Sequence, residues 1–181
     1  EVFCDQGRVQ AMLDFESALA RAEARVGLIP QSAVAPIEAA CQAGLYDFSV
    51  LGEAIATAGN SAIPLVKALG KQVAAQDAEA ERYVHLGATS QDVMDSGLVL
   101  QLRHALALIE QDLAQLAQTL ATQARRYVAT PLAGRTWLQH ATPVTLGMKI
   151  AGWLGAVTRR RQRLQELTPQ LLVLQNDGAS G

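Results

Sequence analysis

The sequence predicts an all-α protein, with an N-terminal helical domain at residues 1–90 followed by the first part of a long-helix bundle at residues 91–181. Half of the 181 residues are hydrophobic but only 4% are aromatic, so a core must be built from aliphatic side chains, which favours packed helices. Apolar residues also recur at intervals of three and four over long stretches, as on one face of a helix. No stretch alternates in the way that would support a nucleotide-binding sheet.

The N-terminal part is predicted to consist of connected helices. One helical face carries the apolar residues Met12, Phe15, Leu19, Ala22 and Val26. Gly27 and Pro30 are expected to end this helix. Two shorter helices are expected to follow Asp47 and Ser61 as N-caps, and the first of them is expected to end at Gly59.

The second half is predicted to contain two much longer helices. Residues 95–126 include no proline, and apolar residues repeat at Leu98, Leu102, Leu106, Ile109, Leu113, Leu116 and Leu120. This spacing predicts a helix of about 48 Å. A second long helix is expected to begin with Thr142 as its cap and Pro143 at its first position, and to run to about Leu167, before Pro169. Helices of this length need partners, so a bundle is expected.

Charge and hydropathy argue against several classes of partner. The net charge is −2 with a pI of about 5.9, and residues 159–161 are the longest run of Lys and Arg, so neither nucleic acid nor a membrane surface is an expected partner. Lys149 interrupts the most hydrophobic stretch, so no membrane span is expected. We predict a soluble cytoplasmic protein with free Cys4 and Cys41. Because the chain opens without methionine and stops at "GASG", the natural protein is expected to extend in both directions.

The connection between the long helices is unusually rich in polar and special residues. It reads "GRTWLQHATPVT" (residues 134–145, signature segment 2) and is long for a link between bundle helices. Long ordered loops are more often functional than idle, so this segment is a candidate site. Its candidate residues, with the lysine that follows, are Arg135, Thr136, Trp137, Gln139, His140 and Lys149.

A second unusual stretch, "HLGATSQDVMDSG" (residues 85–97, signature segment 1), precedes the first long helix. Its hydroxyls, its amide and the N–H groups of a helix N-terminus suit a carboxylate or a phosphate. The candidate residues are His85, Thr89, Ser90 and Gln91. The alternative is an ordinary helix cap, with Thr89 or Ser90 as N-cap and Asp92 favoured by the helix dipole.

Together these two segments, separated by one long helix, resemble the first two signature regions of the fumarase/aspartase superfamily. "TSQDVMDSGLVLQLR" and "GRTWLQHATPVTLGMKIAGWLGAV" are most similar to its lactone-forming cycloisomerases. The resemblance implies a bundle of the fumarase/aspartase type, through which subunits associate as a homotetramer with active sites shared between chains. It also implies that a third signature, a flexible serine-bearing loop, lies beyond Gly181. Asn176 and Asp177 depart from the apolar–glycine pair expected in the glycine-rich turn near the end of the chain.

The resemblance also implies roles for the residues of both segments. The lyases of the superfamily usually have a histidine where this chain has Trp137, and tryptophan cannot transfer a proton at neutral pH. Trp137 therefore argues against an ordinary lyase and fits a cycloisomerase. His140 is the only side chain of signature segment 2 that commonly changes charge near neutral pH. His140, Trp137 and Thr136 are accordingly the catalytic candidates.

The implied reaction is the addition of a muconate carboxylate to a double bond of the same molecule, with protonation of the carbon next to another carboxylate. Such a polycarboxylate needs donors and cations. Substrate-binding candidates are His85, Thr89, Ser90, Gln91, Arg135, Gln139 and Lys149. No metal or organic cofactor is expected.

Two alternatives to a cycloisomerase stay open at this point. The chain could belong to an adenylosuccinate or argininosuccinate lyase, or to a non-catalytic helical scaffold. The polar density of both segments weighs against the scaffold. Single residues also have structural interpretations: Trp137 in a core, His140 bonded to a backbone carbonyl, and Arg135 or Lys149 in an ion pair.

Overall fold

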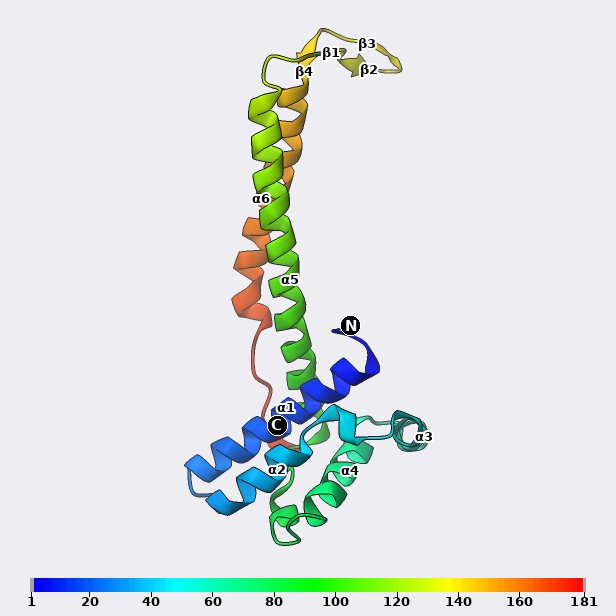
Figure 1. Ribbon diagram of the computed structural model, residues 1–181, viewed down its shortest axis with the longest axis vertical. Helices are drawn as coiled ribbons and strands as arrows, with labels where there is room; N and C mark the ends of the chain where they lie inside the picture. Colours follow the sequence, from blue (N-terminus) through cyan, green and yellow to red (C-terminus); the bar gives the residue numbers. More distant parts are fainter. Residues whose placement is uncertain (1, 181) are drawn as a thin grey trace. The chain divides into compact units, whose positions relative to one another are not determined.

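The computed structural model describes residues 2–180, which form two compact units: the residues up to 104 together with those from 172 onward, and residues 105–171. The described residues are mostly helical, and the fold class is confirmed (Figure 1). The α-helices are α1 Asp5–Arg25, α2 Val34–Ala40, α3 Phe48–Ala58, α4 Ala62–Ala74, α5 Ser90–Arg126 and α6 Leu146–Leu171. Short 3-10 turns are η1 Gln31–Ala33, η2 Ala43–Leu45, η3 Ala80–Tyr83 and η4 Gly178–Ser180. The compact units divide within α5, and the domain boundary after residue 90 stays a prediction.

The core of the first unit is aliphatic, as the composition predicts. Its most deeply buried apolar side chains come from α1, α2, α4 and the start of α5: Met12, Leu13, Ile37, Leu65, Leu69, Val73 and Val93. Aliphatic side chains of this kind stabilise a fold by about 1.5–3 kcal/mol each when they leave water. This packing fixes α1 against the turn that carries signature segment 1.

The buried face of α1 differs from the predicted one. Met12 and Phe15 are buried, but Val26 is 78% exposed. Glu16 and Glu23, which are only 2% and 6% exposed, lie on the buried face instead. The helix ends where Gly27 adopts a φ of 78°, a left-handed conformation that glycine reaches without steric cost.

Of the two N-caps predicted for the shorter helices, Asp47 is confirmed and Ser61 is not. Asp47 caps α3 by accepting hydrogen bonds from the N–H groups of Ser49 and Val50, and the helix closes at left-handed Gly59. The prediction for Ser61 is wrong, because Asn60 Oδ1 accepts the N–H groups of Ala62 and Ile63 at 2.8 and 3.1 Å. Ser61 already has helical dihedral angles, so its hydroxyl cannot cap α4.

Substitutions at these two neighbours should have opposite outcomes. Asn60→Ala is expected to lower the free energy of unfolding by about 1 kcal/mol, because it removes the cap of α4. Ser61→Ala is expected to leave it unchanged or slightly higher, since the buried Ser61 hydroxyl has no hydrogen-bond partner among the described residues. Urea unfolding of both variants measures the difference. A larger loss for Ser61→Ala would contradict the assignment of the cap.

Three predicted helix boundaries in the second half need correction. α5 begins at Ser90 rather than residue 95, because the chain already turns into the helix within signature segment 1. α6 begins at Leu146 rather than at Thr142 and Pro143, since Thr145 Oγ1 accepts the N–H of Met148 at 3.1 Å. It also continues through Pro169 to Leu171.

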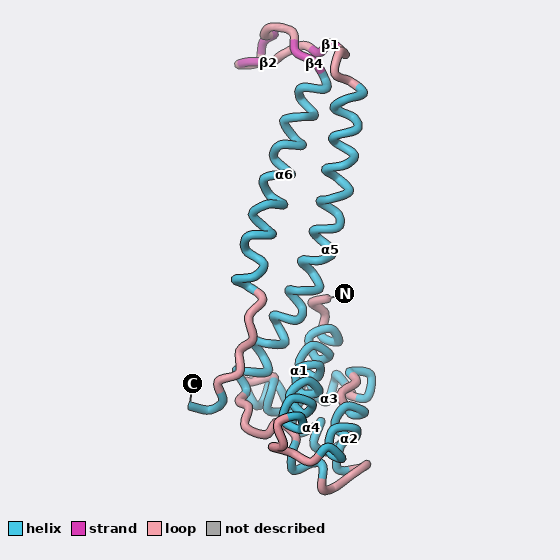
Figure 2. Tube along the Cα trace, turned by 90° about the vertical axis from the view of Figure 1, so that its left-hand side faces the viewer, coloured by secondary structure: helices cyan, strands magenta, loops and turns pink. Residues whose placement is uncertain are grey.

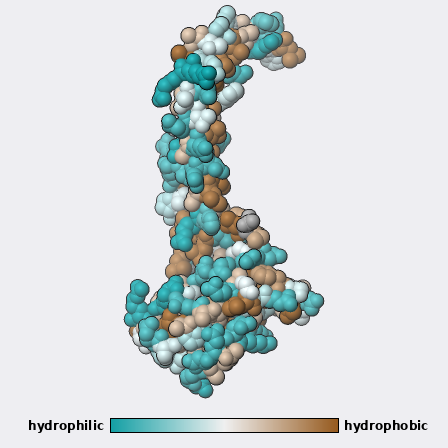
Figure 3. All heavy atoms as spheres, viewed as in Figure 1, coloured by the Kyte–Doolittle hydropathy of each residue, from teal (hydrophilic) through white to brown (hydrophobic). Residues whose placement is uncertain are grey.

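The second unit holds its two long helices together by close contact and by charge. A Cβ at Gly147 would lie 2.6 Å from the carbonyl oxygen of Ala124, so only glycine fits there. Arg161 Nε and Nη2 donate to Glu110 Oε1 at 3.2 and 2.6 Å. Hydrophobic side chains nevertheless remain at the surface of the long helices (Figure 3), including Leu108, Ile109, Leu116, Met148, Trp153 and Leu167.

The connection between α5 and α6 is not the plain loop that the sequence predicts (Figure 2). β1 Pro131–Leu132 pairs antiparallel with β4 Val144–Thr145, and β2 Arg135–Thr136 pairs antiparallel with β3 Gln139–His140. Signature segment 2 therefore contains a small hairpin. Separately, none of the helices formed by residues 2–180 is both long and apolar enough to cross a membrane.

Candidate functional site

Signature segment 1 forms the turn between η3 and α5 and the first turns of α5. Thr89 lies just before the helix, and its carbonyl oxygen accepts the N–H of Val93 at 3.4 Å. Asp92 reaches back and accepts the N–H of Thr89 at 2.9 Å. Asp92 therefore supplies part of the cap of α5, whereas neither hydroxyl of Thr89 and Ser90 caps the helix, and the side chains of Thr89, Ser90 and Gln91 are left for other partners.

Asp92, which the sequence suggested only as part of a helix cap, is a buried acceptor that joins two parts of the chain. It is 1% exposed, and besides Thr89 it accepts the N–H groups of Asp177 at 3.0 Å and Gly178 at 3.1 Å. Burial alone would raise the pKa of Asp92, but these three N–H groups and nearby His85 hold it below its ordinary value. Asp92 is thus an ionised side chain that fixes the glycine-rich turn near the end of the chain to signature segment 1.

The backbone of that turn needs glycine at Gly178. Its φ is 69°, and a Cβ there would lie 3.0 Å from the carbonyl oxygen of Gly87. Ser96 adds a second connection to the same stretch, since its hydroxyl donates to the carbonyl oxygen of Gln175 at 2.7 Å. Although Asn176 and Asp177 differ from the apolar–glycine pair of the family, the turn remains, and its N–H groups bind the Asp92 carboxylate of the protein itself.

His85 does not stand free at the start of signature segment 1. Its Nδ1 lies 2.6 Å from Glu16 Oε1, and the two side chains are 16% and 1% exposed. Burial opposes the charged ring, but the hydrogen bond to Glu16 and the negative charges of Glu16, Asp92 and Glu23 raise the pKa of His85 above its ordinary value. His85 and Glu16 therefore form a buried charge-assisted pair.

Glu16 and Glu23 were missed by the sequence analysis, although a signal was present. Met12, Glu16, Leu19, Glu23 and Val26 follow one another at intervals of four and three residues, so both carboxyls occupy the predicted apolar stripe. Glu23 Oε2 is buried and has no hydrogen-bond partner among the described residues. Burial, followed by repulsion from Glu16, raises the pKa of Glu23 to about 7.

This pKa predicts how stability depends on pH. The folded chain keeps a proton on Glu23 that the unfolded chain releases from about pH 4.5, so the free energy of unfolding should fall as pH rises from about 4.5 to 7. The loss is at most about 3 kcal/mol. The pKa of His85 is also raised on folding, so His85 likewise makes the free energy of unfolding fall as pH rises.

Glu23→Gln should remove most of this pH dependence, because the amide mimics the protonated carboxyl. Melting temperatures between pH 5 and 8 measure it. Glu53→Gln, at an exposed position of α3, is the matched control and should follow the original curve. If the melting temperature changed equally with pH in Glu23→Gln and in the unaltered protein, the raised pKa of Glu23 would be contradicted.

Signature segment 2 presents its candidate residues on the β2–β3 hairpin. Arg135 lies opposite His140 and Thr136 opposite Gln139, a pairing that brings their Cβ atoms to about 5 Å. All four residues are exposed. Successive side chains of a strand point to opposite faces, so Arg135 and His140 share one face of the hairpin and Thr136 and Gln139 share the other.

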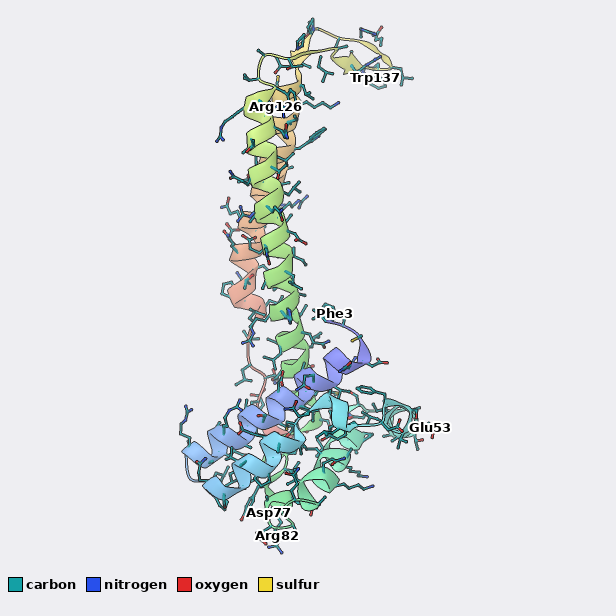
Figure 4. All side chains as sticks on the ribbon, in the orientation of Figure 1. Phe3, Glu53, Asp77, Arg82, Arg126 and Trp137 are labelled. Carbon is teal, nitrogen blue, oxygen red and sulfur yellow. The ribbon has the colours of Figure 1, made fainter. Side chains whose placement is uncertain are left out.

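Trp137 and Leu138 form the turn of this hairpin (Figure 4). Their φ angles are 43° and 64°, in the left-handed region, and Trp137 is 93% exposed. The structural interpretation of Trp137 as a core side chain is therefore wrong for this chain. Residues other than glycine rarely adopt the left-handed backbone conformation, and those that do cluster at functional sites.

The structural interpretations of the other segment 2 residues find no support in residues 2–180. The His140 ring makes no hydrogen bond there, and neither Arg135 nor Lys149 is in an ion pair with the described side chains. Lys149 is exposed in the first turn of α6. These polar groups are accordingly available to a ligand.

The two signature segments lie in different compact units and flank α5. No three His, Cys, Asp or Glu side chains in the described part of the chain are grouped so that they could hold a metal ion. Metal independence of the activity stays a prediction. What both segments offer is a set of neutral donors and cations suited to carboxylates.

Comparison with known proteins supports this interpretation. The model of the family described as "Lyase" matches residues 1–181. The chain is 78% identical over 180 residues to a 3-carboxy-cis,cis-muconate cycloisomerase of Pseudomonas aeruginosa, covering 99% of this chain and 39% of that protein. It is 70% identical over 181 residues to the protein of the same name from Pseudomonas putida, covering all of this chain and 43% of that one.

A solved structure agrees with the sequence relatives. The crystal structure of 3-carboxy-cis,cis-muconate lactonizing enzyme from Pseudomonas putida superposes with a TM-score of 0.97 at 73% identity, covering 99% of this chain and 41% of that one. This chain therefore spans about two fifths of the length of the relatives that it matches. The resemblance of the signature segments to the fumarase/aspartase superfamily is confirmed, and the chain belongs to the Lyase family.

Proposed function

We propose that the full-length protein containing this chain is a cycloisomerase that closes 3-carboxy-cis,cis-muconate to 4-carboxymuconolactone, in the cytoplasmic degradation of aromatic compounds. The observation that carries the proposal is the 78% identity over 180 residues to a protein named for this reaction. Both signature segments lie within the matched residues, so the likeness includes the groups that would contact the substrate.

The reaction is an internal addition, and its nucleophile belongs to the substrate. One carboxylate oxygen forms a C–O bond to a carbon of the double bond. The π electrons of that bond move toward the carbon next to another carboxylate, which then takes a proton. The protein must fold the substrate, stabilise the enolate-like charge that develops on the second carboxylate, and supply the proton.

The polar groups of the two segments suit these tasks. We assign substrate binding to His85, Thr89, Ser90, Gln91, Arg135, Gln139 and Lys149. The three negative charges of the substrate call for cations, which Arg135 and Lys149 provide. Thr136 and Gln139, opposite each other on the hairpin, supply neutral donors. We assign the proton to His140, and Trp137 to a wall of the site.

A lyase of the same family is the second candidate. The chain is 37% identical over 180 residues to an adenylosuccinate lyase of Pyrococcus abyssi, covering 99% of this chain and 39% of that protein. Trp137 argues against this reaction, because an indole cannot transfer the proton that the usual histidine would. The higher identity to the cycloisomerases supports the first candidate.

We also propose that the active site is assembled from several copies of the chain in a homotetramer. The family resemblance implies active sites shared between chains, so we expect signature segment 1 of one copy to lie near signature segment 2 of a neighbouring copy. The exposed Leu116 and Trp153 on α5 and α6 provide apolar surface for such association. Analytical ultracentrifugation should detect tetramers, and a stable monomer at micromolar concentration would refute the assembly.

Ultraviolet spectroscopy tests the reaction directly. The full-length protein, mixed with 3-carboxy-cis,cis-muconate, is expected to abolish the absorption band of the conjugated diene. Adenylosuccinate and argininosuccinate serve as comparison substrates for the lyase alternative. Turnover of either with an unchanged diene band would favour a lyase, and no turnover of any of them would favour the scaffold.

A further inference from the structure

The turn that leads into α5 is strained. His85 has a φ of 58°, in the left-handed region that non-glycine residues rarely adopt. Gly87, two residues later, also has a positive φ of 70°. Such a conformation persists only where surrounding groups hold it, and residues held in this way cluster at ligand-binding sites. The groups that hold His85 therefore bear on how signature segment 1 works.

One end of this turn is held by α1. Glu16 is buried, and its Oε1 lies 2.6 Å from Nδ1 of the His85 ring. A protonated imidazole that donates to a buried carboxylate makes a short, charge-assisted hydrogen bond, stronger than a bond between neutral groups. The contact joins residues 69 positions apart in the sequence, so it fixes the turn to another element.

The other end of the turn is held by Asp92, which accepts the N–H of Thr89. Thr89, Ser90 and Gln91 lie between the two held points. Their side chains make no hydrogen bond to residues 2–180, and Gln91 is exposed. Two buried carboxylates thus fix a short stretch whose own polar groups have no partner within the described chain.

The charges around His85 come from two elements. Glu16 and Glu23 face it from α1, and Asp92 faces it from α5. Glu23 lies seven residues after Glu16 on the same helical face, and its Oε2 is buried without a partner among the described residues. Of the two carboxyls of α1, only Glu16 lies within hydrogen-bond distance of the ring.

We propose that Glu16 is a positioning residue for substrate binding: it holds the His85 ring, and the held ring fixes the turn that presents Thr89, Ser90 and Gln91. The proposal rests on the proposed function, because it takes these three side chains to contact the substrate. Glu16 itself is only 2% exposed, so its proposed role is to hold the ring and not to contact the substrate.

Substitutions of Glu16 in the full-length enzyme test the proposal. Glu16→Gln keeps the size of the side chain and an oxygen acceptor but removes the charge. The pKa of His85, followed by NMR of ¹⁵N-labelled histidine and assigned with His85→Asn, is expected to fall to or below its ordinary value. KM for 3-carboxy-cis,cis-muconate should rise at least about tenfold, with a smaller change in kcat, because displaced binding groups weaken uniform substrate binding.

Two further variants separate positioning from general destabilisation. Glu16→Asp keeps the charge, and it is expected to restore much of the raised pKa of His85 and of the low KM. Asp14→Asn changes an exposed carboxyl of α1 that accepts a hydrogen bond from Gln10, and it should alter neither quantity. Should Glu16→Gln fail to fold, the Glu16→Asp variant carries the same comparison of KM with the pKa of His85.

An unchanged KM in the folded Glu16→Gln variant would overturn the proposal, and so would an unchanged pKa of His85. If the unaltered enzyme does not turn over 3-carboxy-cis,cis-muconate, the proposed function fails first. Calorimetric affinity for this tricarboxylate then replaces KM in the same comparison. Equal affinity of the unaltered and Glu16→Gln proteins, or no affinity in either, would overturn the positioning role as well.

Discussion

Replacing Thr136 or Gln139 with alanine in the full-length enzyme is expected to lower kcat by about 10²- to 10³-fold. Each side chain lies on the exposed hairpin of signature segment 2, and the two lie opposite each other. A donor that meets charge developing in the transition state contributes about 2.7–4 kcal/mol to the barrier. Because both residues are exposed in this chain, their loss should leave the melting temperature nearly unchanged.

The same assay and melting curves provide the controls. Thr142→Ala, at another exposed threonine of signature segment 2, should keep its turnover. Trp137→His restores the residue usual in the lyases, and it should impair lactone closure. His140→Asn should give a larger or pH-shifted loss if the ring moves a proton. Unchanged turnover in all the site variants would remove this hairpin from the active site, and a lowered melting temperature with full turnover would mark a purely structural role.

Asp92→Ala is expected to produce the largest loss of stability, about 3 kcal/mol or more. The Asp92 carboxylate is buried and accepts the N–H groups of Thr89, Asp177 and Gly178. Its removal leaves these donors without a partner, and a hydrogen bond to a charged group contributes about 1.5–3 kcal/mol. The lowered pKa means that this contribution is present above the ordinary value of 3.8 and is lost as the pH falls.

Urea unfolding at pH 7 and pH 3 measures this effect. The difference between Asp92→Ala and the unaltered protein should be large at pH 7 and should shrink at pH 3. Asp95→Ala, one helical turn further along α5, is the matched control, since Asp95 makes no hydrogen bond to the described residues. A loss as large in Asp95→Ala would show that helix propensity, rather than the buried carboxylate, explains the result.

The elements that sequence predicts best are those whose signals are local. Asp47 and Gly59 bound α3 because each supplies its own cap geometry, and the leucine repeat of α5 runs without a proline. The cap of α4 shows the limit of local signals, since Asn60 and Ser61 are both good capping residues. Only the backbone conformation, which the rest of the fold determines, selects Asn60.

The β2–β3 hairpin and the buried carboxylates could not be predicted in the same way. Strands of two residues are too short to show an alternating pattern, and the turn Trp137–Leu138 lacks the Asn-Gly or Asp-Gly pair that usually indicates a hairpin. Glu16 and Glu23 lie within an apolar stripe, but a carboxyl in such a stripe is usually solvated at its edge. Their burial follows from tertiary packing, which also brings His85 to Glu16 from a distant part of the chain.

The exposed Trp137 gives the hairpin an optical property. Indole fluorescence shifts to shorter wavelength when the ring leaves water, so Trp137 at the tip of the β2–β3 turn reports whether that turn is covered. Trp153 on α6, which is 52% exposed, is the only other tryptophan in the sequence, and Trp153→Phe would leave Trp137 as the single tryptophan of this chain. The wavelength of maximum emission then reports on the surroundings of the hairpin without any added dye.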